Sequence, residues 1–310
     1  MFESIKNRVP GGYIYEKISL FKRIHKVFLT DVLAGLLYRI WKYRYWHLFR
    51  AQDEEGLLRR YFTNGFLETA GRKWSVPRKE DMDTFMWEYA DLMMPYLAEK
   101  YDYTKIESLF DEGPYELSEN LSVKKGDVVI DCGANLGLFC SAVADRAEKI
   151  YAFEPSEKLC REYLEPLQTV YPNIVIRNQG VASESLERDF FFYPESSGSS
   201  KMKDINNAST SEDIPDRKCE KQKIPCISID DFVEFHQLLK VDFIKADIEG
   251  AERELLMGAQ KTLARFSPTI SICTYHLPDD KEVLEQLILD ANPKYQIHHA
   301  YKKLYAYVEK

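Results

Sequence analysis

The sequence predicts an α/β protein with a mostly parallel sheet that helices cover on both faces. Residues 111–276 alternate apolar, strand-like segments with amphipathic, helix-like segments, and such alternation is typical of a parallel sheet. One short apolar segment, Val128–Ile130, ends in Asp131 and a glycine-containing turn. A second apolar segment, IYAFE, ends in Glu154. Acids and glycines at the carboxyl ends of strands indicate a ligand crevice like that of Rossmann-like sheets.

The expected elements follow from periodicity and from turn residues. We expect strands at 128–131, 150–154, 174–179, 189–193, 224–228, 242–247 and 269–275, and helices at 136–147, 156–170, 230–239 and 250–264. The tail predicts a helix at 280–290 and then an antiparallel pair formed by YQIHHAY and KLYAYVE. The polar, Ser- and Asn-rich segment 194–218 predicts a long exposed loop.

The chain divides into an N-terminal region, 1–110, and the α/β domain, 111–310. We predict that the N-terminal region is a mainly helical extension, because apolar residues recur at spacings of three and four in FKRIHKVFLTDVLAGLLYRIWKYRYWHLF and MDTFMWEYADLMMPYLAEKY. Within it, residues 20–50 are basic and rich in Trp and Tyr. Such a segment is suited to packing on the α/β domain, to forming a homodimer, or to peripheral contact with an anionic membrane.

Composition and charge narrow the class of protein. The 310 residues, 45% hydrophobic and 30% charged, are typical of a soluble globular chain, and no apolar run is long enough to cross a bilayer. The six cysteines form no CxxC pair, which predicts reduced thiols and a cytoplasmic location, at the inner face of the membrane if residues 20–50 dock there. Residues 1–50 hold ten Lys or Arg against three Asp or Glu, whereas the whole chain carries −8. The acidic body argues against a nucleic-acid partner.

The first motif is Asp131-x-Gly133-x-Asn135-x-Gly137, followed by Glu154 at the end of the next strand. Gly133 and Gly137 lack side chains, so that a ligand can approach the backbone of the turn. Glu154 is placed to accept hydrogen bonds from two ribose hydroxyls. A dinucleotide would require GxGxxG, which fails because position 138 is Leu. The pattern favours S-adenosylmethionine, which has no phosphate and has an amino-acid end.

The second motif is VDFIKADIEGAERELLMGAQKTL. A strand ends in Lys245, Asp247 and Glu249, and Gly250 precedes an amphipathic helix. A carboxylate such as Asp247 at a central strand end usually faces the crevice, while Glu249 could instead lie at the helix N-terminus, where the dipole favours anions. His276 follows the next strand, TISICTY, so it should lie at the same edge as Asp247.

These segments together resemble the FkbM family of S-adenosylmethionine-dependent methyltransferases. The resemblance covers roughly 111–290 and is carried by GPYELSENLSVKKGDVVIDCGANLGLF, YAFEPS, KADIEGAERELLMGA and CTYHLPDD, in the family's order. Its most specific part is KADIEGAE, similar to the family's KxDxEGxE. The resemblance implies the class I methyltransferase (Rossmann-like) fold, a seven-stranded sheet with one antiparallel strand. It also implies O-methylation of hydroxyls on polyketides, sugars or other glycans.

The resemblance also implies roles for individual residues. Asp131, Gly133, Asn135 and Gly137 would line the methionine end of the cofactor, and Glu154 would bind its ribose. The segment that ends in Ala182 would lie beside the adenine. Glu116, in GPYE, would close over the amino-acid end of the cofactor.

Methyl transfer to a hydroxyl needs an aligned acceptor oxygen and a way to remove its proton. Asp247, Glu249 and His276 are the candidates. Lys245 either orients Asp247 or only extends its charged end away from the end of the strand. His276 can act as a general base. Equally, Asp247, Glu249 and His276 can hold a divalent cation that lowers the pKa of the acceptor hydroxyl, and one His with two carboxylates suits Mn²⁺ or Fe²⁺ better than Mg²⁺.

Two other functions compete with O-methylation of a small molecule or glycan. An NAD-dependent oxidoreductase or epimerase would use a similar sheet, but the broken GxGxxG and the absence of a Tyr-x-x-x-Lys pair count against it. A non-catalytic module that binds S-adenosylmethionine would not need Asp131, Glu154, Asp247 and His276 together. Methylation of nucleic-acid amines lacks its N/D-PPY signature, because ADIEG stands in that place.

Overall fold

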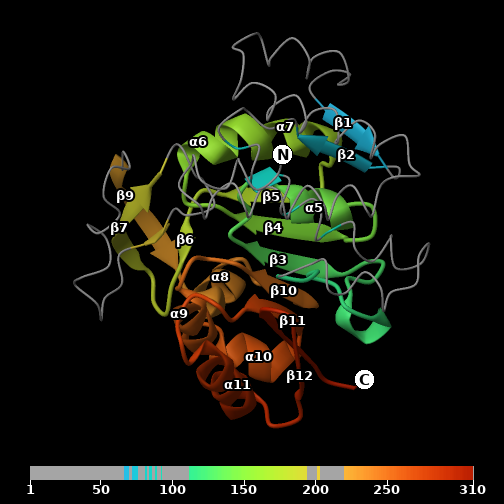
Figure 1. Cartoon of the computed structure of the whole chain (residues 1–310), viewed down its shortest axis with the longest axis vertical. Helices are drawn as coiled ribbons and strands as arrows, with labels where there is room; N and C mark the ends of the chain where they lie inside the picture. The colour runs from blue at the N-terminus through green and yellow to red at the C-terminus, as the bar shows by residue number, and fades with distance from the viewer. Residues whose placement is uncertain are drawn as a thin grey trace, which may run out of the picture.

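A seven-stranded sheet forms the centre of the protein and confirms the predicted α/β fold. The computed structural model describes residues 66–69, 72–75, 81, 84, 85, 88, 92, 112–193, 201–202 and 220–309. The strand order is β12-β13-β11-β10-β3-β4-β5, with β3, β4, β5, β10 and β11 parallel and β13 antiparallel to both of its neighbours (Figure 1). The strands are β3 Val128–Cys132, β4 Lys149–Phe153, β5 Ile174–Arg177, β10 Phe243–Ala246, β11 Thr269–Cys273, β12 Gln296–Ala300 and β13 Lys303–Tyr307.

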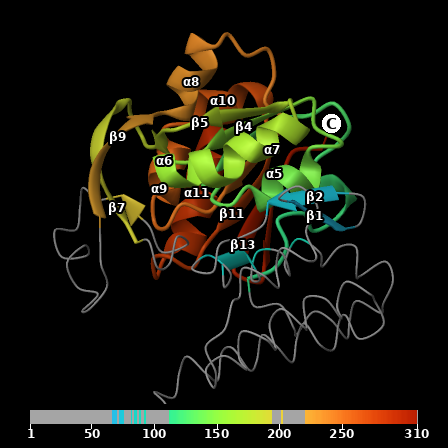
Figure 2. The ribbon, with the colours of Figure 1, turned by 90° about the horizontal axis from the view of Figure 1, so that it is seen from above.

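Helices cover both faces of this sheet, as predicted (Figures 1 and 2). One face carries α5 Leu138–Val143, α6 Glu157–Leu159, a π-helical turn Cys160–Leu164 and α7 Glu165–Val170. The other face carries α8 Ile229–Phe235, α9 Glu252–Met257, α10 Gln260–Phe266 and α11 Asp280–Ala291. A short 3-10 helix, η3, spans Glu119–Leu121.

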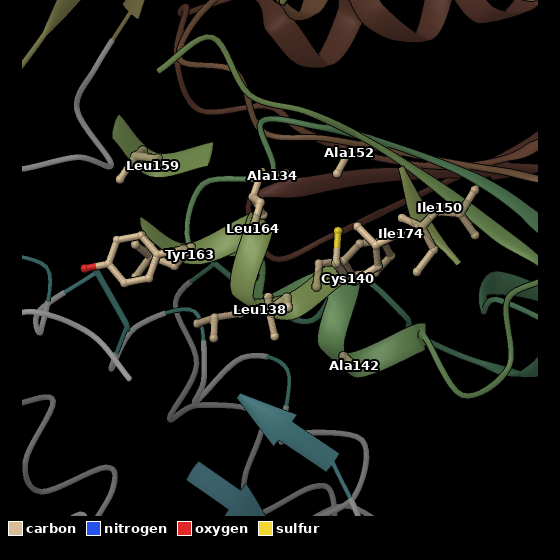
Figure 3. Packing of buried hydrophobic residues seen from close by; sticks show 14 of the residues in the cluster. Ala134, Leu138, Cys140, Ala142, Ile150, Ala152, Leu159, Tyr163, Leu164 and Ile174 are labelled. Carbon is tan, nitrogen blue, oxygen red and sulfur yellow. The ribbon is translucent and has the colours of Figure 1, made fainter. Parts of the chain in front are cut away.

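Two hydrophobic cores result, one on each face, because successive side chains of a strand point to opposite sides. Val129 of β3 packs with Leu138 and Leu164 under α5–α7, and Figure 3 shows this layer. Its neighbour Ile130 packs with Leu255 and Leu263 under α8–α11. The central strand β3 is buried along its whole length, which is why it reads as a continuous apolar run in the sequence.

A second, four-stranded sheet was not predicted. Its order is β6-β9-β7-β8, with β6 Gly180–Val181, β7 Leu186–Phe192, β8 Lys201–Met202 and β9 Glu220–Ile227. The predicted strands 189–193 and 224–228 therefore exist but pair antiparallel with each other, outside the main sheet. The alternation of buried and exposed residues in β9 is the mark of a sheet with one solvated face. β8 lies within the predicted loop 194–218, most of which is outside the described residues.

The predicted helix 250–264 is two helices, because α9 ends before Gly258 and α10 begins at Gln260. A β-carbon at Gly258 would lie 2.4 Å from the carbonyl oxygen of Ala182. Only glycine allows the helix end to approach the chain after β6 this closely. Within the described residues, no helix is long and apolar enough to cross a membrane.

The prediction that residues 1–110 are mainly helical is wrong at 66–75, where β1 Phe66–Thr69 and β2 Arg72–Ser75 form an antiparallel hairpin. Trp74 is fully buried in the core under α5–α7, and the hydroxyl of Ser75 donates to the carbonyl of Tyr163 at 3.1 Å. The hairpin thus packs on the α/β domain. The basic segment 20–50 lies outside the described residues.

Candidate active site

Asp131 and Lys245 form a buried ion pair between the neighbouring strands β3 and β10. Their Cα atoms are register partners, and Lys245 Nζ lies 3.1 Å from Asp131 Oδ1. Lys245 Nζ also donates to the carbonyl of Gly133 at 2.6 Å. Burial opposes the charge on Lys245, but Asp131 and Asp247 hold its pKa above the ordinary value. The contacts of Lys245 fix Asp131 and the turn after β3. Its charge also lowers the pKa of Asp247, and its role in orienting Asp247 stays a prediction.

The two motif glycines are required by packing. Both have positive φ, +78° at Gly133 and +74° at Gly137. A β-carbon at Gly133 would lie 2.0 Å from the carbonyl oxygen of Asp247, and one at Gly137 would lie 2.4 Å from Leu167 Cδ1. Protein atoms occupy the space that we expected a ligand to use. The turn after β3 is thus pressed directly against the end of β10.

Glu154 holds the same turn from the β4 side. Its side chain is 5% exposed, and its two oxygens accept the backbone N–H groups of Asn135 at 2.9 Å and Ser156 at 2.8 Å. Burial raises its pKa to about 7, although both hydrogen bonds lower it. Asn135 sits at φ +48°, an uncommon conformation for a residue with a side chain. The contact of Glu154 with a ribose stays a prediction. Each carboxylate oxygen keeps a lone pair that could accept a hydrogen bond from a ribose hydroxyl.

Glu88 is a site residue that the sequence did not reveal. Asn135 Nδ2 donates to Glu88 Oε1 at 2.7 Å, so the region before residue 111 reaches the turn of the first motif. Burial raises the pKa of Glu88 to about 8, against the lowering effect of Lys245. In the sequence, Glu88 is one acid among several in MDTFMWEYADLMM, and no spacing relates it to Asn135.

Glu116 and Ala182 have internal partners. The carboxylate of Glu116 forms a bidentate pair with Arg146 at 2.9 and 3.0 Å and accepts the N–H of Val123 at 2.8 Å. These contacts do not support the predicted closure over the cofactor, because both oxygens are already bonded at the end of α5. Ala182 is fully buried, and its N–H donates to the carbonyl of Ile227. Its place beside the adenine stays a prediction.

Asp247 follows β10, and its backbone carbonyl lies against Gly133 of the first motif. Its backbone N–H donates to the carbonyl of Cys132 at 3.1 Å. Tyr115 donates its hydroxyl to Asp247 Oδ2 at 2.6 Å, and Tyr275 donates to Oδ1 at 3.4 Å. Burial raises the pKa of Asp247, but Lys245 and His276 outweigh it and the net shift is downward. Asp247 is therefore an ionised, half-buried carboxylate, whose side chain is 19% exposed. In GPYE, the tyrosine rather than the following acid reaches this site.

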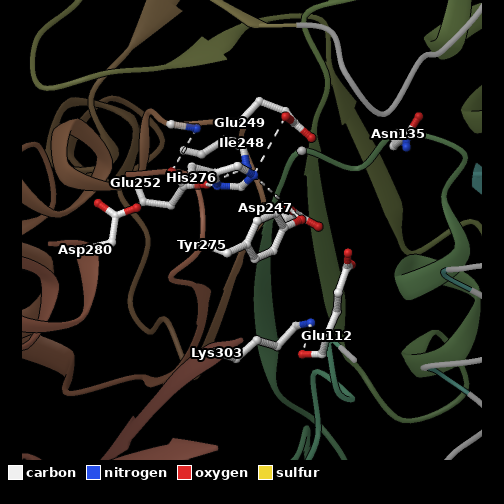
Figure 4. A network of polar contacts seen from close by, with 12 residues as sticks. Glu112, Asn135, Asp247, Ile248, Glu249, Glu252, Tyr275, His276, Asp280 and Lys303 are labelled. Atoms are coloured by element: carbon white, nitrogen blue, oxygen red, sulfur yellow. Dashed lines mark hydrogen bonds and ion pairs between the residues drawn. The ribbon is translucent and has the colours of Figure 1, made fainter. Parts of the chain in front are cut away.

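His276 lies between three carboxylates, as Figure 4 shows. Its Nε2 is 3.8 Å from Asp247 Oδ1 and 3.7 Å from Glu249 Oε2, and its Nδ1 is 2.9 Å from Glu252 Oε1. The structure thus brings together the three residues predicted from separate segments. Burial opposes a charge on His276, but Glu252 and the other two acids raise its pKa to about 9. Burial also raises the pKa of Glu249 to about 8.

Glu252 takes the structural role that was one alternative for Glu249. It lies in the first turn of α9 and is buried, and its oxygens accept the N–H groups of Ile248 at 2.9 Å and Gly250 at 3.0 Å. This local hydrogen bonding holds Glu249 at φ +54° beside Gly250 at φ +102°. The side chain of Glu249 is consequently released toward His276.

The turn after His276 is fixed by Asp280. This buried carboxylate accepts the N–H of Leu277 at 2.8 Å, and Arg253 Nε donates to it at 2.8 Å. Arg253 belongs to α9, so one helix holds both the Glu249 turn and the His276 turn. The two acids that end YHLPDD, Asp279 and Asp280, therefore fix the turn that carries His276 through their bonds to Arg253 and to the backbone.

Comparisons with known proteins give the identity of the domain. A segment of the AMB antimetabolite synthetase AmbE from Pseudomonas aeruginosa is 27% identical over 159 residues, which cover 42% of this chain and 8% of that protein. A solved methyltransferase FkbM from Methylobacillus flagellatus KT is similar at 19% identity, covering 75% of this chain and 56% of that one, with a TM-score of 0.47. SMU.1697c from Streptococcus mutans, solved in complex with SAH, is 11% identical over 59% of this chain and 88% of that one, with a TM-score of 0.35.

This chain thus spans only part of the first two of these proteins, about half of the solved FkbM chain and a small part of AmbE. The family model of the methyltransferase FkbM domain matches residues 131–304, which is more than half of the chain and includes both motifs of the site. The chain belongs to the FkbM family of methyltransferases.

Proposed function

We propose that the protein transfers the methyl group of S-adenosylmethionine to a hydroxyl oxygen of a sugar, a glycan or another small natural product. The observation that carries the proposal is the contact between the two motifs. Asp247, which ends the second motif's strand, lies against Gly133 of the first, and Lys245 ties Asp131 to the same turn. A cofactor held by the first motif would have the second motif as its neighbour.

The first motif supplies the cofactor half of the proposed site. Glu154 marks the end of β4, where ribose hydroxyls can donate to a carboxylate, and the turn 133–137 is held rigidly by Glu154, Glu88 and Lys245. Rigid placement matters because transfer requires the sulfonium carbon and the acceptor oxygen to be aligned at about 3 Å. S-adenosylmethionine therefore suits the site better than a dinucleotide, whose GxGxxG turn is absent.

The second motif supplies the acceptor half. When the acceptor oxygen attacks, an O–CH₃ bond forms, the S–CH₃ bond breaks and the hydroxyl proton must leave. Asp247, Glu249 and His276 form a cluster of titratable groups beside the cofactor half, and Asp247 is ionised and half-buried. A cluster that removes a proton is needed for a hydroxyl acceptor, so these residues favour O-methylation.

Composition and similarity to a known protein point to the class of acceptor. The acidic composition disfavours a nucleic acid. The similarity to a segment of an antimetabolite synthetase supports a small metabolite. Contact of residues 20–50 with an anionic membrane, homodimer formation and a cytoplasmic location stay predictions, and sedimentation of the full chain with anionic vesicles tests the first of these.

The test is transfer of label from methyl-labelled S-adenosylmethionine to a panel of sugars, glycans and polyhydroxylated natural products, with S-adenosylhomocysteine measured in parallel. We expect labelled product together with an equal amount of S-adenosylhomocysteine. Binding of both cofactor forms without turnover of any acceptor would favour a non-catalytic binding module. Labelling of amines in preference to hydroxyls would contradict O-methylation.

A further inference from the structure

Asp247, Glu249 and His276 have the spacing of metal ligands. One ligand atom from each can be chosen so that all three lie within 4.8 Å of one another. His276 Nε2 is 3.8 Å from Asp247 Oδ1 and 3.7 Å from Glu249 Oε2, too far for hydrogen bonds. Two atoms that each lie about 2.1 Å from one ion are themselves roughly 3.0 to 3.5 Å apart. Small side-chain movements would therefore give a coordination sphere.

The imidazole of His276 points a free nitrogen into this cluster (Figure 4). The side chain is 8% exposed, and within the described part of the chain Nε2 has no hydrogen-bond partner. A buried nitrogen without a partner is costly unless something occupies the space in front of it. Here that space lies between two carboxylates.

Glu252 fixes which nitrogen is available. It lies 2.9 Å from Nδ1, and its own position is set by the N–H groups of Ile248 and Gly250. An ionised carboxylate can only accept, so the contact with Glu252 favours a proton on Nδ1, and Nε2 is the nitrogen that can give up its proton to bind a cation. Histidines that bind metals usually donate their other ring N–H to a carboxylate or carbonyl in this way.

The charges leave room for a cation. Among the ion pairs of the described residues, Glu249 and Asp247 have only His276 as a positively charged partner. Lys245 is turned to Asp131 and Gly133, and the Nζ of Lys303 donates to the carbonyls of Glu112 and Gly113. Tyr115 and Tyr275 give Asp247 neutral donors. Asp247 and Glu249 thus share one imidazole, which also faces Glu252.

We propose that Asp247, Glu249 and His276 bind one divalent cation of the Mn²⁺ class, with Glu252 as the positioning residue for His276. One nitrogen and two carboxylate oxygens suit Mn²⁺, whereas Mg²⁺ prefers oxygen ligands alone. Three protein ligands leave positions on a six-coordinate ion that an acceptor can fill.

The substrate class follows if the cation and the proposed methyl transfer act together, so this step rests on the proposed function. An acceptor with two neighbouring oxygens, such as a vicinal diol or an α-hydroxy acid, could bind the open positions through both. The cation would lower the pKa of the bound hydroxyl, whose proton leaves to water. The oxygen then takes the methyl group, and the sulfur leaves as neutral S-adenosylhomocysteine.

The test is titration of Mn²⁺ into the full chain after dialysis against EDTA, with free Mn²⁺ followed by electron paramagnetic resonance. We expect one site per chain, lost in Glu249→Gln and His276→Gln and weakened about ten- to a hundredfold in Glu252→Gln. Glu249→Gln is the safest variant, since its side chain is 30% exposed and has no other ion-pair partner in the described residues. His299→Gln is the matched control, because His299 also pairs with a carboxylate, Glu285, at 2.7 Å but on the surface.

Binding that is absent in the wild type, or that survives Glu249→Gln and His276→Gln alike, would overturn the cation site. Preference for Mg²⁺ over Mn²⁺ would overturn the ligand assignment. These outcomes do not depend on the binding of S-adenosylmethionine. If methyl transfer persists in EDTA, the reaction does not use the cation, while the methyltransferase proposal still holds. Methylation only of acceptors with isolated hydroxyls would contradict the substrate class.

Discussion

The two halves of the site use their charged residues in opposite ways. Around β3 and β4, Asp131 and Glu154 are bound by Lys245 and by backbone N–H groups, so they build the shape of a turn. Around β10 and β11, the side chain of Glu249 and Nε2 of His276 form no hydrogen bond within the described residues. The first motif is thus a framework, whereas the second presents reactive atoms. Substitutions should therefore have different consequences in the two halves.

The largest effect should come from Asp247→Asn. The amide keeps the size of the carboxylate and can still accept the hydroxyl hydrogen bond of Tyr115, but it loses the negative charge. We expect methyl transfer to fall about a thousandfold, because the variant loses a charge that either removes the acceptor proton or holds the cation that lowers the pKa of the acceptor, and loss of such a group typically costs a hundred- to ten-thousandfold. Initial rates with an acceptor from the panel measure this. Asp145→Asn, at an exposed carboxylate, is the control. If Asp247→Asn kept a rate within threefold of wild type, the second motif would not supply the reactive groups.

The next effect concerns stability. Lys245→Met leaves Asp131 buried without its cation, so we expect the free energy of unfolding to fall by about 3 to 5 kcal/mol. Urea denaturation followed by circular dichroism measures it. Lys261→Met, at an exposed lysine, should change stability by less than about 0.5 kcal/mol. Equal effects at both lysines would show that the ion pair does not hold the framework.

Two glycines separate packing from backbone conformation. Gly126 and Gly133 both have positive φ, +87° and +78°, but a β-carbon at Gly126 meets nothing within 4 Å, whereas one at Gly133 meets the carbonyl of Asp247 at 2.0 Å. We expect Gly126→Ala to cost about 1 kcal/mol and Gly133→Ala about 3 kcal/mol. Thermal or urea unfolding compares them. A smaller loss at Gly133 than at Gly126 would mean that the two motifs are not pressed together.

Glu154→Gln should weaken S-adenosylmethionine binding about ten- to a hundredfold, since a charged acceptor of hydrogen bonds contributes about 1.5 to 3 kcal/mol. The amide keeps one oxygen for a backbone N–H but puts a donor opposite the other. Calorimetry measures the affinity. Glu157→Gln, at an exposed acid at the start of α6, is the control and should bind normally.

The smallest effect is a pH dependence of cofactor binding. Because burial raises the pKa of Glu154 to about 7, the group is increasingly protonated in the folded protein below that pH. Ionised Glu154 is the form that accepts from both backbone and ribose, so affinity should rise between pH 6 and 8, by at most tenfold per pH unit. The same raised pKa means that folding stability from this group is present below its ordinary pKa and declines as pH rises through about 7. The Glu154→Gln variant has no titrating group at this position, so any pH dependence of its affinity comes from other groups, such as those of the cofactor. If wild type and variant showed the same dependence of affinity on pH, Glu154 would not be its cause.

Sequence predicted the parts of the structure that repeat a simple pattern. The buried parallel strands read as apolar runs, and polar residues at their ends mark one edge of the sheet. The sequence therefore predicts the position of Asp131, Glu154, Asp247 and His276 at that edge, where the structure also has them. The second sheet is not predicted because, among the described strands, β7 and β9 pair with each other and otherwise with strands of two residues. Pairing partners depend on contacts that a single strand's pattern does not encode.

The roles within the site could not be read so well. Lys245, Glu116 and Glu252 are all charged residues near a motif, and only the structure shows that they bond to Asp131, Arg146 and the backbone around Gly250. Glu88 and Tyr115 reach the site from outside the strand-helix repeat, so no spacing could reveal them. A sequence motif shows where a charged residue lies along the chain, whereas the residue that pairs with it is determined by how the chain packs in three dimensions.

The most direct measurement is calorimetric titration of S-adenosylmethionine into the wild type, Glu154→Gln and Asp247→Asn, with methyl transfer measured on the same samples. The account predicts that the wild type binds and turns over, that Glu154→Gln loses most of its binding, and that Asp247→Asn binds within about threefold of wild type yet transfers about a thousandfold less. Loss of binding in Asp247→Asn with normal binding in Glu154→Gln would contradict it, because the cofactor would then belong to the other half of the site.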